Sequence, residues 1–128
     1  MLFISYSTRD RGKRYAGQLK YKLEEAFFQC FLAHEDIQES EDWVKTILGQ
    51  LRDCAAFLGV IDNAFNKSAY CQQELGAALA LDKPMLLISR DGATHPTCLA
   101  QWIQSGKPQG VLRALRNQSR FRLLRTEA

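Results

Sequence analysis

The most hydrophobic segment of the chain is residues 55–61, AAFLGVI, and the charged residue Asp62 follows it directly. A short, uninterrupted apolar run of this kind is typical of a strand that is buried on both faces in a parallel sheet. Three shorter runs have the same character and are predicted as further strands: residues 1–5 (MLFIS), 30–33 (CFLA) and 84–89 (PMLLIS).

Helical periodicity separates these strands. Apolar residues recur at helical spacing over residues 13–29, and again after Ser40, which we expect to cap a helix with Glu41 and Asp42 in its first turn. A third helix is predicted over residues 68–81, because this run is rich in alanine and leucine and a proline soon follows it. Strands that alternate with helices through short loops predict an α/β protein with a parallel sheet and helices on both faces.

The other segments are less regular. Residues 62–67 are predicted as a loop, and residues 97–104 as a short helix. Residues 110–124 contain apolar residues without a clear period, so their structure is left open. We expect one domain over residues 1–128, in which the basic stretch 113–128 is either a last helix or a linker.

Composition is that of a globular domain. The 128 residues are 46% hydrophobic and 24% charged, which suits a single buried core. No run approaches the ~20 apolar residues of a membrane span, and the N-terminus lacks the pattern of a signal peptide, so we expect a cytoplasmic protein without membrane association. The four cysteines and two histidines are widely separated, so we expect reduced thiols and no metal site.

Basic residues crowd both ends of the chain, although the formal net charge is only +3. Neither aromatic residues interleaved with basic ones nor a helix-turn-helix pattern accompanies them. Solvated helix faces therefore explain these charges better than nucleic-acid binding does.

The helix predicted over residues 68–81 contains a single carboxylate, Glu74. Helical spacing places it beside the apolar stripe, with Tyr70 one turn earlier, and the stripe itself comprises Cys71, Leu75, Ala78 and Leu79. Ligands of doubly wound sheets bind at the carboxyl ends of the strands, and Glu74 would lie one to two turns below that edge. Spacing alone favours an ordinary solvated glutamate, because most carboxylates on helices are surface charges.

Several enzyme classes are excluded by missing motifs. No glycine-rich phosphate loop follows the first strand, and neither histidine belongs to a nucleophile elbow. A receiver domain of a response regulator remains an alternative, because Asp62 ends the third strand, but the acidic pair expected after the first strand is missing.

Three stretches carry a family resemblance: FISY at residues 3–6, the acidic loop that leads into Trp43, and FNKSAYCQQE at residues 65–74. Together, over residues 2 to about 90, they resemble a bacterial-type Toll/interleukin-1 receptor (TIR) domain. The resemblance implies a flavodoxin-like three-layer fold with strand order 2-1-3-4-5. It also implies two uses, which are assembly with other TIR domains through the loop after the second strand and cleavage of NAD+ between nicotinamide and ribose.

The resemblance also implies roles for individual residues. Glu74 matches the catalytic glutamate of the members that cleave NAD+. The positions that match contacts of the nucleotide, or neighbour such contacts, are Ser7, Thr8, Arg9, Glu35, Asp36, Trp43 and Tyr70. Two departures are that Tyr70 replaces a usual tryptophan and that residues 35–40 lack the proline and glycine often found there.

We therefore expect an NAD+ hydrolase or cyclase that needs no cofactor, acts in bacterial antiviral defence or immune signalling, and self-associates. A sensor domain, fused or separate, is a further expected partner. The alternatives are a non-enzymatic TIR scaffold and a related nucleoside glycosyl-transfer enzyme, which would also use a glutamate against a ribose.

Overall fold

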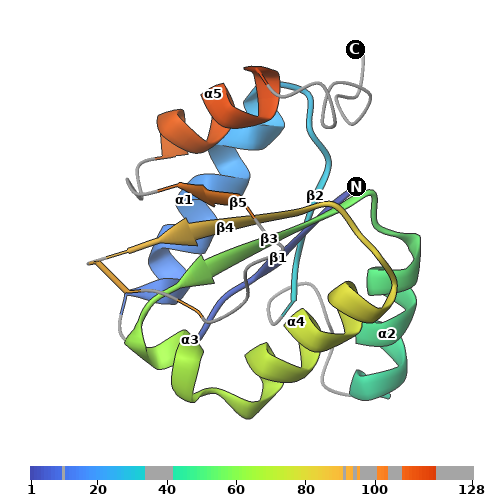
Figure 1. Cartoon of the computed structure of the whole chain (residues 1–128). Helices are drawn as coiled ribbons and strands as arrows, with labels where there is room; N and C mark the ends of the chain where they lie inside the picture. Colours follow the sequence, from blue (N-terminus) through green and yellow to red (C-terminus); the bar gives the residue numbers. More distant parts are fainter. Residues whose placement is uncertain are drawn as a thin grey trace.

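A computed structural model shows a five-stranded parallel sheet with strand order β2-β1-β3-β4-β5 (Figure 1). The structure describes residues 1–9, 11–33, 42–90, 92–93, 95, 101–103 and 108–117, except for the side chains of Trp43, residues 101–103 and Asn117. The strands are β1 (Leu2–Ser5), β2 (Cys30–Leu32), β3 (Ala56–Ile61), β4 (Met85–Ser89) and β5 (Gln101–Ile103). The predicted fold class and strand order are confirmed.

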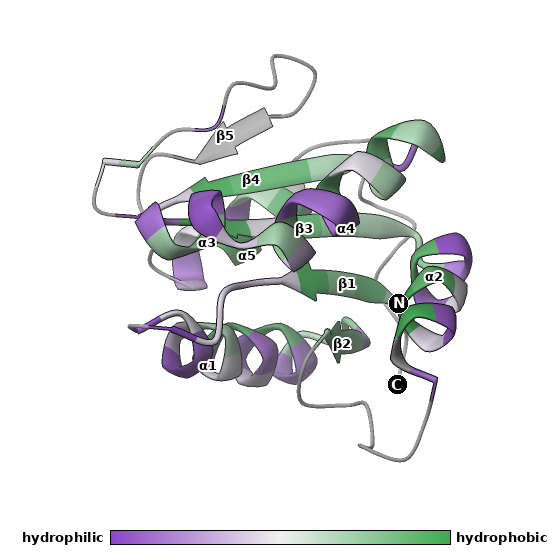
Figure 2. Cartoon of the chain, turned by 90° about the horizontal axis from the view of Figure 1, so that it is seen from below, coloured by the Kyte–Doolittle hydropathy of each residue, from purple (hydrophilic) through white to green (hydrophobic). Residues whose placement is uncertain are grey.

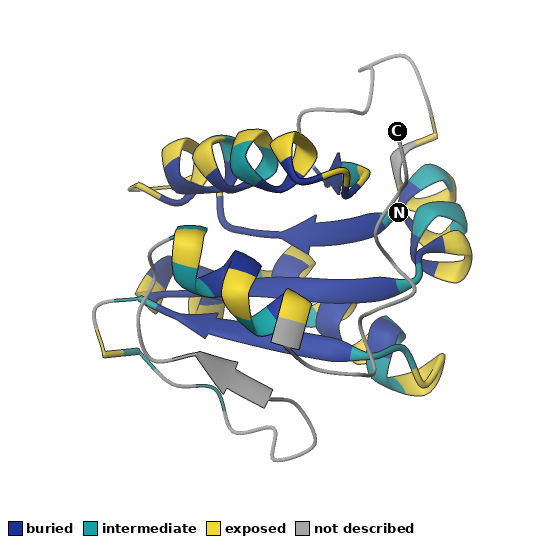
Figure 3. Cartoon of the chain, turned by 90° about the horizontal axis from the view of Figure 1, so that it is seen from above, coloured by how far each residue is buried: buried dark blue, intermediate teal, exposed yellow. Residues whose placement is uncertain are grey.

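Helices cover both faces of the sheet, as Figure 1 shows. One face carries α1 (Gly12–Glu25) and α5 (Pro108–Asn117), and the other carries α2 (Trp43–Asp53), α3 (Asn63–Lys67) and α4 (Ala69–Ala80). Strands β1, β3 and β4 are mostly apolar (Figure 2) and buried (Figure 3), whereas the helices expose a polar outer surface and bury the side that faces the sheet. The result is two hydrophobic clusters separated by the sheet.

Alternation along β1 decides which side chain faces which helix layer. Leu2 and Ile4 belong to the cluster under α1 and α5, whereas Phe3 belongs to the cluster under α2 and α4. Because successive residues of a strand point to opposite faces, Ser5 faces the α2 and α4 side. The register pairs Ser5 with Gly59 of β3, so this serine lies at the carboxyl edge of the sheet.

Two helix starts differ from the prediction. The cap of α2 is Asp42, whose side chain accepts a 3.3 Å hydrogen bond from the backbone N–H of Lys45. Asp42 therefore precedes the helix, and the prediction that it lies in the first turn is wrong. Ser40 and Glu41 are outside the described residues. The predicted loop over residues 62–67 contains α3, because Asp62 accepts a 2.7 Å bond from the N–H of Phe65 and so caps a short helix.

The C-terminal part also needs a correction. Residues 101–103, predicted within a short helix, form strand β5, which pairs with β4 through Leu86 and Gln101, and the rest of that predicted helix is outside the described residues. Pairing with the edge of β4 satisfies backbone groups of these residues and of β4 together, which spacing within residues 97–104 cannot show. Helix α5 begins at Pro108, a position where proline costs no hydrogen bond. No helix among the described residues is long and apolar enough to cross a membrane.

Candidate active site around Glu74

Helix α4 brings Glu74 into the protein interior. Ser68 caps the helix, as predicted, and its hydroxyl accepts a 3.2 Å bond from the N–H of Cys71. The buried residues of α4 are Cys71, Glu74, Leu75 and Ala78. Glu74 is only 3% exposed, so it belongs to the buried stripe itself and does not merely border it.

One hydroxyl group holds this carboxylate. Ser5 at the end of β1, itself 0% exposed, donates a 2.7 Å hydrogen bond from Oγ to Oε1 of Glu74. The other oxygen, Oε2, is buried and has no hydrogen-bond partner among the described residues. An unpaired buried oxygen on an ionisable group is costly unless a water, a ligand or a proton satisfies it.

The environment changes the acidity of Glu74. Burial raises the pKa of its carboxyl from 4.5 to about 7, while the hydrogen bond from Ser5 acts in the opposite direction. Near neutral pH both the ionised and the protonated forms are therefore populated. A carboxyl in this state is a common property of catalytic sites.

Glu74 opens onto a small crevice between α2 and α4. The crevice has a volume of about 60 Å³ and is lined by Val44, Ile47, Leu48, Leu51, Tyr70, Gln73 and Glu74. Val44 and Tyr70, which line it, are 64% and 49% exposed, so the crevice is accessible from the surface. Pockets that bind small molecules have volumes of roughly 300–1,000 Å³, so the crevice has room only for part of a nucleotide.

The predicted residues of the first loop lie apart from this crevice lining. Ser7 is buried, and its hydroxyl accepts a 3.2 Å bond from the N–H of Arg9, which is a local turn contact. Thr8 and Arg9 are exposed. None of the three lines the crevice in the part of the chain that the structure describes, and their predicted contacts with a nucleotide stay predictions.

The other predicted site residues divide into two groups. Tyr70 lines the crevice together with Glu74. Glu35 and Asp36 lie outside the described residues, and Trp43 begins α2 but its side chain is also outside them.

Sequence reasoning missed Ser5. It reads as the polar end of an apolar strand, and its partner lies 69 residues further along the chain. The useful signal would have been the alternation of side chains along β1, which places Ser5 on the same face as Phe3 and therefore toward α4.

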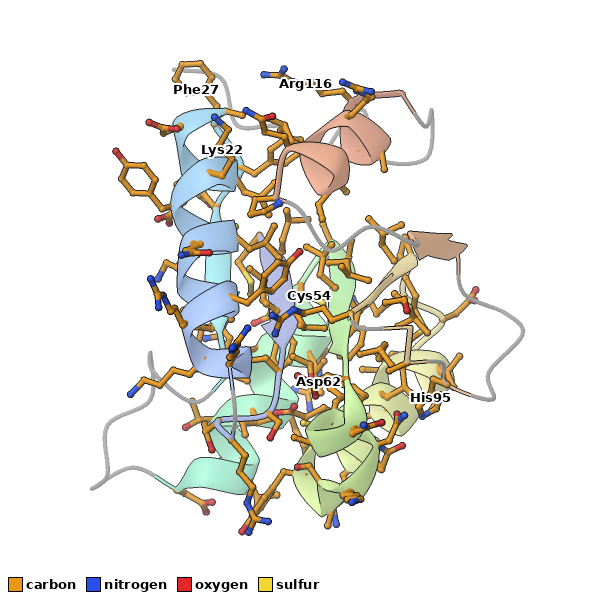
Figure 4. All side chains as sticks on the ribbon, turned by 90° about the vertical axis from the view of Figure 1, so that its left-hand side faces the viewer. Lys22, Phe27, Cys54, Asp62, His95 and Arg116 are labelled. Atoms are coloured by element: carbon orange, nitrogen blue, oxygen red, sulfur yellow. The ribbon has the colours of Figure 1, made fainter. Side chains whose placement is uncertain are left out.

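Asp62, the residue that suggested a receiver domain, is engaged in contacts at the end of β3 (Figure 4). One of its oxygens caps α3, and the other lies 3.8 Å from the guanidinium of Arg90. Arg90 in turn lies over the ring of Tyr15, 4.6 Å from its centre. These contacts give Asp62 a structural role that joins β3, β4 and α1.

The described residues contain no group of three or more side chains arranged to hold a metal ion. Cys30, Cys54 and Cys71 form no disulfide bond among the described residues, and Cys98 is outside them.

Comparisons with known proteins agree with this architecture. The family model described as "TIR domain" matches residues 2–119. A search of the curated proteins found no match. Among solved structures, the TIR domain of a Toll-related receptor from Hydra magnipapillata has a TM-score of 0.71 and 18% identity, and the match covers 91% of this chain and 98% of that one.

Two enzymes have similar structures. A 2-deoxyribosyltransferase from Bacillus psychrosaccharolyticus has a TM-score of 0.70 and 15% identity over 99% of this chain and 98% of its own. A CMP N-glycosidase from Clostridium botulinum has a TM-score of 0.63 and 16% identity over 89% of this chain and 96% of its own. At these identities the likeness shows the fold alone.

Proposed function

This chain belongs to the TIR domain family, and from that premise we propose that it cleaves NAD+ between nicotinamide and ribose, with Glu74 as the catalytic carboxylate. The products would be nicotinamide and either ADP-ribose or a cyclic isomer of it. One observation carries the proposal: Glu74 is buried beside a crevice, with one oxygen bonded to Ser5 and the other without a partner.

The chemistry of NAD+ matches a site with one carboxylate. The bond between ribose C1′ and the pyridinium nitrogen breaks, and its electron pair neutralises the ring, so nicotinamide leaves without needing a proton. Positive charge then develops on the ribose, and an ionised Glu74 would stabilise this oxocarbenium-like state. Water, which loses a proton, or a nitrogen of the substrate's own adenine then attacks C1′.

The free oxygen of Glu74 has a specific task in this scheme. A ribose hydroxyl would donate to Oε2 and so satisfy the acceptor that the protein leaves unpaired. The apolar wall formed by Val44, Ile47 and Leu48 would exclude water from this contact and strengthen it. Tyr70 at the mouth offers an aromatic surface for the leaving ring.

A second candidate is cleavage of an N-glycosidic bond in a nucleoside or nucleotide without a cationic base. The structural likeness to a CMP N-glycosidase and a 2-deoxyribosyltransferase favours it. A neutral base, however, usually leaves only after protonation. Apart from Glu74 itself, the polar side chains that line the crevice are Tyr70 and Gln73, in the part of the chain that the structure describes. We therefore place NAD+ first.

The proposal includes assembly with other TIR domains in the cytoplasm and a role in antiviral defence or immune signalling. Its support is family membership. A turnover number that rises with protein concentration would support assembly of the active form.

The test measures NAD+ consumption at high protein concentration and separates the products by chromatography. We expect Glu74→Gln to lower kcat by at least ~10²-fold, since it removes the charge and keeps the shape. The matched control is Glu24→Gln, which neutralises an exposed carboxylate of α1 and should retain full activity. CMP and deoxynucleosides are tested in parallel.

Three outcomes distinguish the two candidate activities from a non-enzymatic role. Consumption of NAD+ that depends on Glu74 supports the proposal. Turnover of CMP or deoxynucleosides without NAD+ turnover supports the second candidate. A protein that is inactive on every substrate, even when concentrated, overturns both and leaves a TIR interaction module.

A further inference from the structure

The bond between Ser5 and Glu74 joins two distant elements at the point where the chemistry is proposed. Ser5 ends β1 and Glu74 lies in the second turn of α4, and both side chains are almost completely removed from solvent. Their 2.7 Å contact has the usual length of a hydrogen bond between a hydroxyl and a carboxyl group.

No other polar group among the described residues competes for this carboxylate. The side chains that face it from α2 across the crevice are apolar: Val44, Ile47, Leu48 and Leu51. Cys71, one turn earlier on α4, is a titratable neighbour of Glu74, and burial raises the pKa of its thiol to about 11. The nearby hydroxyls of Ser68 and Ser5 act in the opposite direction, with the smaller effect. Cys71 therefore stays neutral near pH 7. Among the described residues, Ser5 is the group that donates a hydrogen bond to the carboxylate of Glu74.

The asymmetry of the carboxylate is what gives the bond a function. One oxygen is bonded to Ser5, which is buried and paired within the sheet, and the other has no partner among the described residues. A carboxylate held at one oxygen cannot rotate freely, so its second oxygen keeps one direction. Such fixed acceptors are effective because no reorganisation is needed when charge develops.

We propose that Ser5 is a positioning residue: its hydroxyl fixes Oε1 of Glu74 and thereby aims Oε2 at the substrate. The proposal rests on the proposed function, because it assigns Ser5 a part in the same reaction. Ser5 acts through Glu74 and has no contact of its own with the reacting atoms.

The consequence can be measured on the carboxyl group itself, without any substrate. Removing the hydroxyl in Ser5→Ala takes away the one interaction that favours the ionised form, so we expect the pKa of Glu74 to rise by about one to two units. The titration would be followed by the infrared band of the protonated carboxyl group. Glu74→Gln, which lacks the group, identifies the band.

A matched control exists at the same edge of the sheet. Ser89 ends β4, is also buried, and its hydroxyl bonds to the carbonyl of Ala93 and not to Glu74. Ser89→Ala therefore removes an equivalent buried serine hydroxyl and should leave the titration of Glu74 unchanged. Ser5→Thr keeps the hydroxyl and should restore most of the wild-type titration.

The kinetic experiment uses NAD+ as the probe. We expect Ser5→Ala to lower kcat about tenfold at pH 7 with little change in KM, and to move the rising limb of the pH profile to higher pH, while Ser89→Ala follows the wild type.

Two failures would be distinguishable. An active wild type whose Ser5→Ala variant keeps both its kcat and the titration of Glu74 overturns the role of Ser5 and leaves the proposed function standing. An inactive wild type overturns the proposed function, and the role of Ser5 in the reaction falls with it, whatever the titration shows.

Discussion

The two faces of the sheet bury their polar atoms in different ways. Under α1 and α5, the hydroxyl of Tyr15 is buried without a hydrogen-bond partner among the described residues, but its ring lies beneath the guanidinium of Arg90. Burial raises the pKa of this phenol further above its already high value, so it stays neutral. Under α2 and α4, the unpaired atom belongs to Glu74, which changes its charge near pH 7.

The difference between an unpaired hydroxyl and an unpaired carboxyl shows which face of the sheet costs the fold more stability. A neutral hydroxyl without a partner costs the protein a modest, constant amount, whereas a buried carboxylate costs more as it ionises. A protein that only needed a core could place leucine on α4, as it does at Leu75. The cost on the α2 and α4 face is therefore the one that the proposed function would explain.

The largest effect is expected for Glu74→Gln, measured as stability against pH. In the unfolded chain the carboxyl titrates near 4.5, and in the folded protein near 7, so folding takes up a proton between these values. Stability of the wild type should therefore fall as pH rises from 4.5 to 7, by about 3 kcal/mol in all. Glutamine does not titrate, so the variant should be more stable than wild type above pH 7 by about this amount.

Urea denaturation at pH 4, 6 and 8.5 measures this difference, provided that the slope against urea is the same for both proteins. The free energies of unfolding of the wild type and the glutamine variant should become equal at pH 4. A glutamine variant that is equally stable or less stable at pH 8.5 would show that Glu74 is ionised in the folded protein without cost, which would contradict its buried, singly bonded state.

Most of the strands and helices that form these two faces could be predicted from the sequence, for physical reasons. Uninterrupted apolar runs such as residues 55–61 have few alternatives to a buried strand. Ser68 marks the start of α4 because its side chain caps the helix. Glu74 could be selected because α4 contains no other carboxylate and because the surrounding motif resembles a family. These signals are local, so one sequence is enough to read them.

What the sequence did not reveal depends on distant partners. Ser5 gains its importance only when parallel pairing brings β1 under α4. Residues 101–103 become a strand because β4 has an edge to pair with. The full burial of Glu74 likewise results from packing of α2 against α4, which helical spacing on one element cannot show. Helix α3 is the exception, because its cap bond from the N–H of Phe65 to Asp62 is local and was not recognised in the sequence.

A smaller effect is expected at the far end of the α2 and α4 face. The ammonium of Lys83, just after α4, donates to the carbonyls of Arg52 and Cys54 at 2.7 and 2.8 Å, and so joins the end of α2 to the end of α4. Lys83→Met keeps the aliphatic chain and loses both bonds. Because the lysine is partly exposed, we expect a loss of only about 1–2 kcal/mol, equal at pH 5 and pH 8.

The control for this change is Lys67→Met, which removes an exposed charge from α3 and should alter stability by less than ~0.5 kcal/mol. If Lys83→Met also leaves stability unchanged, water replaces both bonds at no cost and the two helices are held by their apolar contacts alone.

The smallest effect is expected from Tyr15→Phe, on the opposite face. The substitution removes a buried hydroxyl that has no hydrogen-bond partner among the described residues and leaves the ring under Arg90 in place. The free energy of unfolding should change by no more than ~0.5 kcal/mol, or rise slightly, since an unsatisfied group is lost and the void is small. Because the phenol stays neutral over the whole range, the difference from wild type should be the same at pH 4 and pH 8.5, and NAD+ consumption should be unchanged. A loss above ~1 kcal/mol would mean that the hydroxyl has a bound partner such as an ordered water, and the contrast between the two faces would then reduce to charge alone.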